Sequence, residues 1–300
     1  MTTSTLQTGT VRLRVGHYFE VCKPKVVAVM LFTALVGMLL AAPLSLSFYT
    51  MLAAMTGIAL VSAAAAAINH VADHRIDALM QRTRNRPLPT GTLSAREVLT
   101  FAGVIGSVGT LILVFWVNLL TAILTLLSLV GYAVIYTRFL KYATPQNIVI
   151  GGAAGATPPM LGWTAATGQL DFGAFLLFLI VFVWTPPHFW ALAMCRKKEY
   201  AEAGIPMLPV THGEDFTRLQ ILLYIILLTL VTMLPYATGL SGVVYLFSAT
   251  LLNVVFIYYG LVLRVNRTPN KAMETFGFSI VYIMLLFTAL LVDRYISLLV

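Results

Sequence analysis

The sequence predicts an all-α polytopic membrane protein, a bundle of nine transmembrane helices. Hydrophobic residues make up 59% of the 300 residues and charged residues only 10%, a balance typical of membrane proteins. The apolar residues also come in runs close to the roughly 20 residues that a helix needs to cross a bilayer. We therefore expect residues 1–300 to form a single membrane-embedded domain.

Each predicted helix is an apolar run that polar or charged residues bound. Asn118 divides the third run from the fourth, because the stretch between Arg96 and Arg138 suits two short helices better than one very long one. In chain order the predicted helices are 26–42 after Lys25, 52–68 before Asn69, 98–117 after Arg96, 119–136 before Arg138, 148–163 after Asn147, 172–194 after Asp171, 219–237 after Arg218, 243–263 before Arg264 and 276–292 before Asp293.

The basic residues lie almost wholly on one side of the predicted membrane. Of the 19 Lys and Arg residues, all but Arg294 precede the first helix or follow the second, fourth, sixth and eighth. Basic residues are retained in the cytoplasm, so we expect a multi-pass protein of the bacterial inner membrane with a cytoplasmic leader (1–25), a cytoplasmic N-terminus and a periplasmic C-terminus. The net charge of +8 would serve anionic lipids or ligands at that face, not nucleic acid.

Two cytoplasmic loops, 69–97 and 195–218, are long and hold most of the acids, so we expect the active site there. Asn69, Asp73 and Asp77 are four residues apart, which places them on one helix face. Such oxygens suit Mg²⁺ shared with phosphate. The alternative is a helix end stabilised by ion pairs, but aspartates continuing a membrane helix are costly unless they face a polar cavity.

Basic side chains follow the acids in both loops. Arg82, Arg84 and Arg86 carry planar guanidinium groups that suit phosphate oxygens, although taken alone they are better explained as a positive-inside anchor. The second loop offers cations for phosphate and carboxylates three residues apart, and taken alone it is a basic membrane anchor. These residues are Arg196, Lys197, Lys198, Glu199 and Glu202.

His188 lies inside the predicted helix 172–194, directly after Pro186 and Pro187. We expect the two prolines to kink or unwind this helix. An intramembrane histidine has three interpretations: a haem ligand, a proton handler or a hydrogen bonder between helices. His70, in contrast, is expected to be a solvated or capping histidine at the cytoplasmic interface.

Several blocks resemble a known family. The segment NHVADHRIDALMQRTRNRPLPTG at 69–91 resembles the NxxxDxxxD signature of the UbiA superfamily of intramembrane prenyltransferases. Further blocks are similar to its protohaem IX farnesyltransferase (haem O synthase) branch, in order along nearly the whole chain: KPK at 23–25, GGAAGATPPMLGW at 151–163, WTPPHFWALA at 184–193 and EYAEAGIPMLPV at 199–210.

The resemblance implies a Mg²⁺-dependent enzyme that transfers the farnesyl group of farnesyl diphosphate to a vinyl group of haem B with addition of water, giving haem O and diphosphate. Haem B would be a substrate, not a permanent cofactor. Many superfamily members carry a second DxxxD motif, where this chain has Glu199 and Glu202, so a second metal site does not follow. By resemblance, the residues that would hold Mg²⁺ and diphosphate are Asn69, Asp73 and Asp77. Those that would contact phosphate are Arg82, Arg86 and Lys198. Glu199 and Tyr200 would help bind substrate, and His188 would engage haem.

Two other functions remain open at this point. A prenyltransferase of the same superfamily acting on another aromatic acceptor would share the first motif but not the WTPPHFW block. A transporter would carry ionisable residues near the midplane rather than at one edge. The expected partners are farnesyl diphosphate, haem B and the lipid bilayer, and either self-association or contact with haem-handling or oxidase-assembly proteins is compatible with the sequence.

Overall fold

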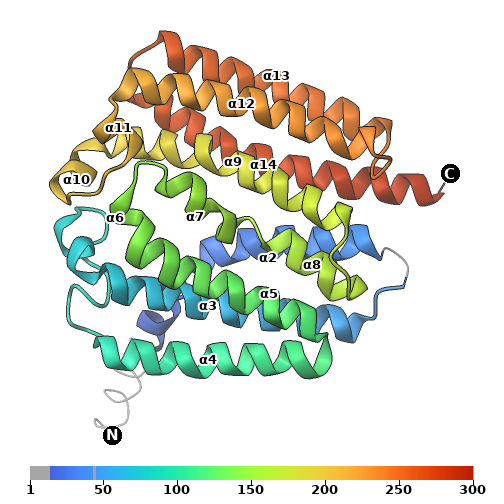
Figure 1. Ribbon diagram of the computed structural model, residues 1–300, viewed down its shortest axis with the longest axis horizontal. Coiled ribbons are helices and arrows are strands. Elements are labelled where there is room, and N and C mark those ends of the chain that lie inside the picture. Colours follow the sequence, from blue (N-terminus) through green and yellow to red (C-terminus); the bar gives the residue numbers. More distant parts are fainter. Residues whose placement is uncertain (1–13, 43–44, 300) are drawn as a thin grey trace, which may run out of the picture.

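The computed structural model describes residues 14–42 and 45–299, and this part of the chain is a bundle of helices without strands (Figure 1). A helical stretch at 14–21 precedes the bundle. The elements that follow are α2 (Pro24–Ala41), α3 (Phe48–Leu79), α4 (Ala95–Trp116), α5 (Leu119–Val130), the π-helix η1 (Gly131–Leu140), α6 (Lys141–Ala143), α7 (Asn147–Gly155), α8 (Pro158–Thr167), α9 (Phe172–Cys195), α10 (Lys197–Glu202), α11 (Leu208–Thr211), α12 (Glu214–Ala237), α13 (Val243–Val265) and α14 (Pro269–Leu299).

Within the described residues, eight spans are long and apolar enough to cross a membrane. The predicted continuous helix 148–163 is wrong, because it is replaced by the two short helices α7 and α8. Pro158 and Pro159 open α8, and a proline has no N–H with which to continue the hydrogen bonds of a preceding helix. Figure 1 shows α7 and α8 following one another across the bundle.

Glycines let α8 lie directly against α2. A Cβ atom added at Gly162 would overlap the carbonyl of Ala34, and one added at Gly37 would overlap the carbonyl of Pro159. The two backbones therefore touch, as small residues allow in membrane helices. This contact ties the broken pair α7–α8 to the first long helix.

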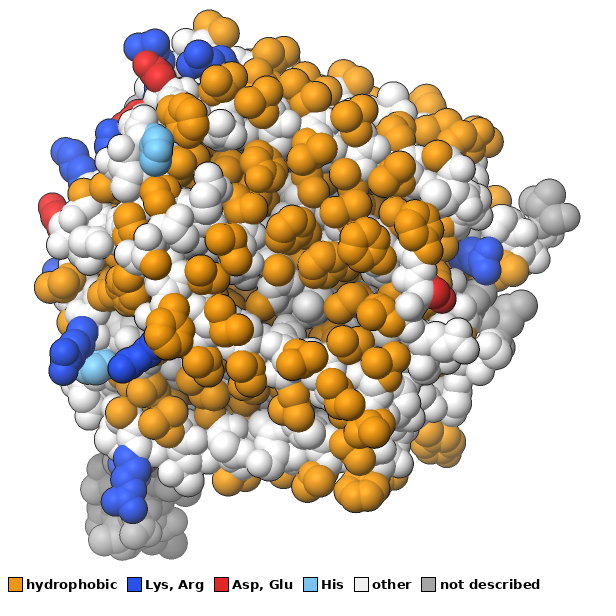
Figure 2. All heavy atoms as spheres, in the orientation of Figure 1, with side chains coloured by type: hydrophobic (Ala, Val, Ile, Leu, Met, Phe, Trp, Pro, Cys, Tyr) orange, Lys and Arg blue, Asp and Glu red, His pale blue; other side chains and the backbone are white. Residues whose placement is uncertain are grey.

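The charges gather at one end of the bundle. The connections after α3, α6, α9 and α13 lie at the left in Figure 1, where α2 begins, whereas α14 ends at the right. Figure 2 shows most of the visible Lys, Arg, Asp and Glu side chains along that left edge, beside a broad hydrophobic face. Large exposed hydrophobic side chains of the bundle include Phe115, Leu230 and Phe247, which are 72%, 63% and 72% exposed, as expected for a protein whose outer surface meets lipid.

The helix α9 is central and remains α-helical through Pro186 and Pro187, so of the two expected outcomes, a kink or local unwinding, the unwinding is wrong. A proline φ angle is compatible with a helix, and only the hydrogen bonds of its missing N–H are lost. The neighbouring helices α12 and α14 pack along α9 and bury most of its inner side chains, including both prolines. Tertiary packing thus holds the helix together across the double proline.

Candidate functional site

The site is built on α3, which continues past the predicted end at residue 68 as far as Leu79. Asn69, Asp73 and Asp77 therefore lie on one helix, as predicted. Their side chains point inward: the residues are only 4%, 6% and 5% exposed. Two carboxylates held away from both lipid and water need compensating cations or ligands.

Three cations from separate segments supply this compensation. Lys23, just before α2, donates from Nζ to Oδ1 of Asn69 at 2.6 Å. The Nζ atom of Lys141 lies 2.7 Å from Oδ1 of Asp73. Arg86 donates from Nη1 to Oδ2 of Asp77, also at 2.7 Å. Of the three, the sequence predicted a phosphate contact only for Arg86; Lys23 lay in the KPK block of the resemblance without a role, and Lys141 was one of the basic residues of the cytoplasmic face.

The backbone of Lys23 is strained. Its φ angle is +50°, the one positive φ among the described non-glycine residues, and the left-handed region costs an ordinary residue roughly 1–2 kcal/mol. Burial, with a further contribution from the nearby Arg86, lowers the pKa of the Lys23 ammonium to about 8. A strained, partly desolvated lysine points to a role beyond packing.

The π-helix η1 brings a further partner to Asn69. The amide of Asn69 donates from Nδ2 to Oδ2 of Asp73 at 3.0 Å and to Oγ1 of Thr137 at 3.1 Å. The Thr137 hydroxyl in turn donates to the carbonyl of Tyr132 at 2.7 Å, five residues back. This network fixes the Asn69 amide with its oxygen toward Lys23 and its nitrogen toward Asp73. π-helical turns are frequent at functional sites, but the apolar pattern of 119–136 carried no sign of one.

Two polar groups in this cluster are left without aligned hydrogen bonds. Although Oδ1 of Asp73 is close to Lys141, it accepts no well-directed hydrogen bond, and neither ring nitrogen of His70 has a partner. The expectation of a solvated His70 is wrong: this residue is 2% exposed, because it lies on the inner side of α3. Buried polar atoms without partners are unusual, and here they adjoin the predicted ligands.

The second long loop approaches the cluster through Tyr200 on α10. Burial raises the pKa of the Tyr200 phenol, and the guanidinium groups of Arg82 and Arg196 act in the opposite direction. The phenol also lies within electrostatic range of Asp73. The structure thus brings Arg82 and Tyr200, from loops more than a hundred residues apart, to one region.

Other residues of the second loop are not part of this cluster in the structure. Glu199 receives a hydrogen bond from Arg196 at 2.7 Å, and Glu202 is exposed. Lys198 is also exposed and has no hydrogen bond or ion pair with any described residue. The structure therefore leaves its expected phosphate contact as a prediction.

His188 is buried between α9 and α14. Its ring stacks on Trp184 and Phe276 at centroid distances of 4.3 and 4.6 Å, and its Nδ1 lies 2.7 Å from Oγ of Ser279. Since the Ser279 hydroxyl donates to the carbonyl of Phe276 at 2.6 Å, it accepts from Nδ1–H of the imidazole. The hydrogen bond between helices, one of the three interpretations, is confirmed, and Nε2 has no hydrogen-bond partner among the described residues.

His188 does not pair with the acids of α3. All its hydrogen-bond and ring partners among the described residues belong to α9 and α14. His188 lies seven residues before the end of α9 at Cys195, and Asp73 lies six residues before the end of α3 at Leu79. Both helices end at the charged edge of the bundle (Figure 1).

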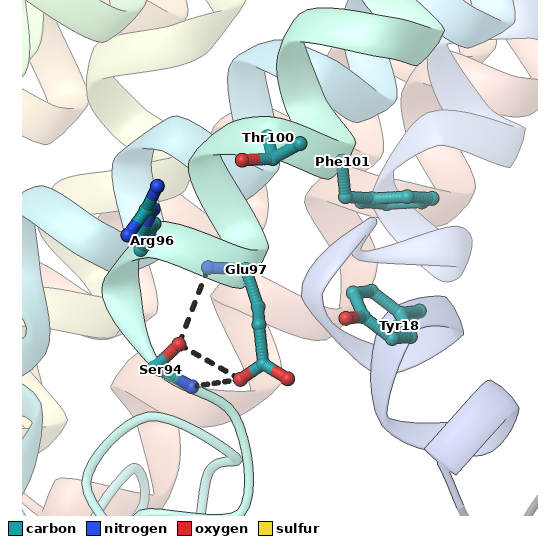
Figure 3. Close-up of a pocket in the computed structure, with 6 residues that line it drawn as sticks. All are labelled: Tyr18, Ser94, Arg96, Glu97, Thr100 and Phe101. Atoms are coloured by element: carbon teal, nitrogen blue, oxygen red, sulfur yellow. Dashed lines mark hydrogen bonds between the residues drawn. The ribbon is translucent and has the colours of Figure 1, made fainter.

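A hollow of about 410 Å³ near the N-terminal helix is separate from this cluster (Figure 3). Its charged groups are already engaged: the carboxylate of Glu97 accepts from the backbone N–H of Ser94 at 2.9 Å and pairs with Arg14 at 3.3 Å. Tyr18 packs against Phe101 there at a centroid distance of 4.9 Å. This capping box and its neighbours join the helix at 14–21 to α4 and have a structural role.

Comparison with known proteins identifies the family. Residues 30–290 match the model of the UbiA prenyltransferase family. A protein of Pseudoalteromonas atlantica named Protoheme IX farnesyltransferase 2 is 58% identical over 278 residues, which cover 93% of this chain and 91% of that protein. A protein of Nitrosomonas eutropha named Protoheme IX farnesyltransferase is 51% identical over 295 residues, covering 98% and 99% of the two chains.

Solved structures of low sequence identity share the fold. A structure described as digeranylgeranylglyceryl phosphate synthase has a TM-score of 0.79 and 19% identity, covering 94% of this chain and 98% of that one. A UbiA homologue from Archaeoglobus fulgidus bound to GPP and Mg²⁺ has a TM-score of 0.60 and 17% identity, covering 91% and 99%. More than nine-tenths of the chain therefore shares the fold of these structures.

Proposed function

Because the chain belongs to the UbiA prenyltransferase family, we propose that it transfers the farnesyl group of farnesyl diphosphate to a vinyl group of haem B, with addition of water, to give haem O and diphosphate. The observation that carries this proposal is the 51–58% identity, over almost the full chain, to proteins named protoheme IX farnesyltransferase. The buried cluster on α3 supports it, because a diphosphate leaving group needs such a set of charges.

Asp73 and Asp77, together with Asn69, would hold Mg²⁺. Their chemistry fits this ion, since magnesium prefers one or two carboxylates plus substrate phosphate oxygens. The Oδ1 atom of Asp73 pairs with Lys141 but accepts no aligned hydrogen bond, so it would become a metal ligand once Lys141 turns to the phosphate. Bound there, Mg²⁺ would neutralise negative charge on the diphosphate as it departs.

The cations of the site would bind the diphosphate itself. Lys23, Arg82, Arg86 and Lys141 outnumber the two carboxylates, so the cluster has an excess of positive charge that an anionic ligand offsets. The cations now engaged with Asp73 and Asp77 would then turn to phosphate oxygens. Lys198 and Tyr200, from the second loop, would add contacts to the phosphate or prenyl end, with Glu199 holding Arg196 in place.

The chemistry follows from charge separation. The bond between the farnesyl C1 and the diphosphate oxygen breaks, and its electron pair leaves with the diphosphate. The allylic cation is attacked by a vinyl carbon of haem B, and the new cation beside the porphyrin ring takes up water and loses a proton. Enclosure of the site within the helix bundle would protect the first cation from premature water.

His188 would engage haem B through its open Nε2 atom. The hydrogen bond to Ser279 leaves the lone pair on Nε2, and the stacked rings of Trp184 and Phe276 hold the imidazole in one orientation. A histidine that binds a metal centre ordinarily donates its other N–H to such a partner. This geometry supports iron ligation by His188 more directly than proton transfer.

The topology belongs to the same proposal. With the broken pair α7–α8 counted as one crossing, the eight long spans become nine, which accounts for α2 beginning and α14 ending at opposite ends of the bundle. The charged end would face the cytoplasm across the bacterial inner membrane, and the chain would act as a single domain. Single cysteines introduced at Arg84 and at Gly239 test this: only the second should react with a membrane-impermeant maleimide added outside intact spheroplasts.

The reaction is tested with purified protein, haem B, farnesyl diphosphate and Mg²⁺. The extracted pigment should gain the mass of one farnesyl group plus one hydroxyl group, and removal of Mg²⁺ with a chelator should stop the gain. Competing aromatic acid acceptors in the same mixture test the other type of prenyltransferase. Prenylation of such an acceptor with haem B unchanged would overturn the assignment of haem as substrate.

A further inference from the structure

A second hollow, of about 550 Å³, lies on the outer surface between α3, α4 and η1. We call it the α3–η1 groove. Its floor and walls are apolar and include Ala72, Leu99 and Val134. The last two side chains are 47% and 45% exposed, so the groove opens on the hydrophobic surface that meets lipid acyl chains.

The polar rim of this groove carries basic groups without acids. His74, Arg75 and Arg138 line it, and its lining includes no Asp or Glu. Both arginines are exposed, and neither has a hydrogen bond or ion pair with any described residue. The hollow of Figure 3 differs on this point, because Glu97 lies in it and is paired with Arg14.

The neighbouring acids do not compensate these charges. Asp73 and Asp77 lie on the same helix as Arg75 but on its buried side, where Lys141 and Arg86 already pair with them. The α3–η1 groove thus has two uncompensated guanidinium groups above an apolar channel, at the charged edge of the bundle. A ligand that fits must be anionic at one end and apolar along the other.

We propose that the α3–η1 groove binds one anionic phospholipid of the surrounding leaflet. Its phosphate would lie between Arg75 and Arg138, and an acyl chain would follow the channel past Leu99 and Val134. Basic pockets between membrane helices at this level are suited to acidic headgroups, and each Lys or Arg near the membrane surface contributes about 1 kcal/mol to their binding. Both walls of the groove also carry site residues, Asn69 on α3 and Thr137 on η1, so the lipid would brace the two elements that hold the Asn69 amide.

The test is direct binding to the full chain, delipidated in a non-ionic detergent. Dioleoyl phosphatidylglycerol is then added to the wild type and to the double variant Arg75→Gln/Arg138→Gln. Native mass spectrometry counts the lipid molecules that each protein retains. We expect the wild type to keep one phosphatidylglycerol that the variant loses, with about 25-fold weaker binding for the two arginines together. Dioleoyl phosphatidylcholine should show no such retained molecule.

Two further variants keep the result interpretable. Arg96→Gln/Arg264→Gln removes the same charge from the same edge outside the groove and should bind phosphatidylglycerol like the wild type. Ala72→Phe fills the channel without changing the charge and should lose the lipid. It provides an independent test if the arginine variant does not fold. Equal retention by wild type and Ala72→Phe, equal retention of phosphatidylcholine, or displacement of the lipid by millimolar inorganic phosphate would each overturn the proposal.

Discussion

Two of the polar clusters in the described part of the bundle differ in charge and in completeness. The first joins α12, α13 and α14 through uncharged side chains: Tyr282 donates to Oδ1 of Asn253 at 2.6 Å, and Asn253 donates from Nδ2 to Oγ1 of Thr232 at 2.9 Å. The buried carboxylate of Asp293 borders this neutral cluster and accepts from the backbone N–H of Tyr245 at 3.0 Å. Tyr245 donates to the Thr232 carbonyl at 2.8 Å. None of these side chains keeps a buried polar atom without a partner.

The cluster on α3 is charged and incomplete. Cations from three segments meet Asn69, Asp73 and Asp77, while His70 and one oxygen of Asp73 lack aligned partners. Neutral, satisfied networks join membrane helices, whereas buried charges with spare bonding capacity cost stability and are retained for function. The comparison therefore assigns structure to the first cluster and ligand binding to the second.

The largest expected effect is that of neutralising a carboxylate in the α3 cluster. Asp73→Asn keeps the size of the side chain but removes the charge that would bind metal, so we expect turnover to fall about 10³-fold. The melting temperature should also fall, because the substitution leaves the buried ammonium of Lys141 without its carboxylate partner. Haem O formation and thermal unfolding of the purified variant provide both measurements, and turnover within tenfold of the wild type would contradict the assignment.

The next effect concerns His188, whose ring is held by one hydrogen bond and has one nitrogen open. Ser279→Ala removes the acceptor that fixes the imidazole tautomer, so the KM for haem B should rise about 10–100-fold. The KM for farnesyl diphosphate should not change. Ser279→Thr keeps the hydroxyl, so its KM for haem B and the absorption spectrum of bound haem should match those of the wild type. An equal rise of the KM for both substrates in Ser279→Ala would indicate a folding defect.

A smaller effect is expected from pH. The ammonium of Lys23, with its pKa near 8, is lost as the pH rises through that value, so an anionic diphosphate should bind more weakly at pH 9 than at pH 7. The KM for farnesyl diphosphate should rise several-fold across this range in the wild type. In Lys23→Arg the guanidinium remains charged, and a rise of the same size in that variant would assign the titration to another group.

The smallest effect on catalysis is expected in the neutral cluster. Tyr282→Phe deletes the hydroxyl that donates to Asn253, so the protein should lose about 1 kcal/mol of stability. With kcat and both KM values unchanged, the melting temperature should fall by roughly 2–4 °C. Loss of turnover with an unchanged melting temperature would break the distinction between the two clusters.

Local patterns predicted much of the fold. Long apolar runs mark most of the spans, and the spacing of four between Asn69, Asp73 and Asp77 predicted their common face on a helix. The break between α7 and α8 and the continuity of α9 both depend on prolines. The pair Pro158 and Pro159 separates α7 from α8, whereas the pair Pro186 and Pro187 lies inside α9. The packing around each pair decides which outcome is stable.

The sequence by itself determined the membrane class, the gathering of charge at one end and the helix face that carries the acids, since each depends on residues close together in the chain. Only the tertiary structure decided which cations meet those acids. Lys23, Lys141 and Thr137 come from segments far from α3, and a π-helical turn sets the position of the last. Ser279 likewise reaches His188 across 91 residues. Such meetings depend on how helices pack, which no local periodicity encodes.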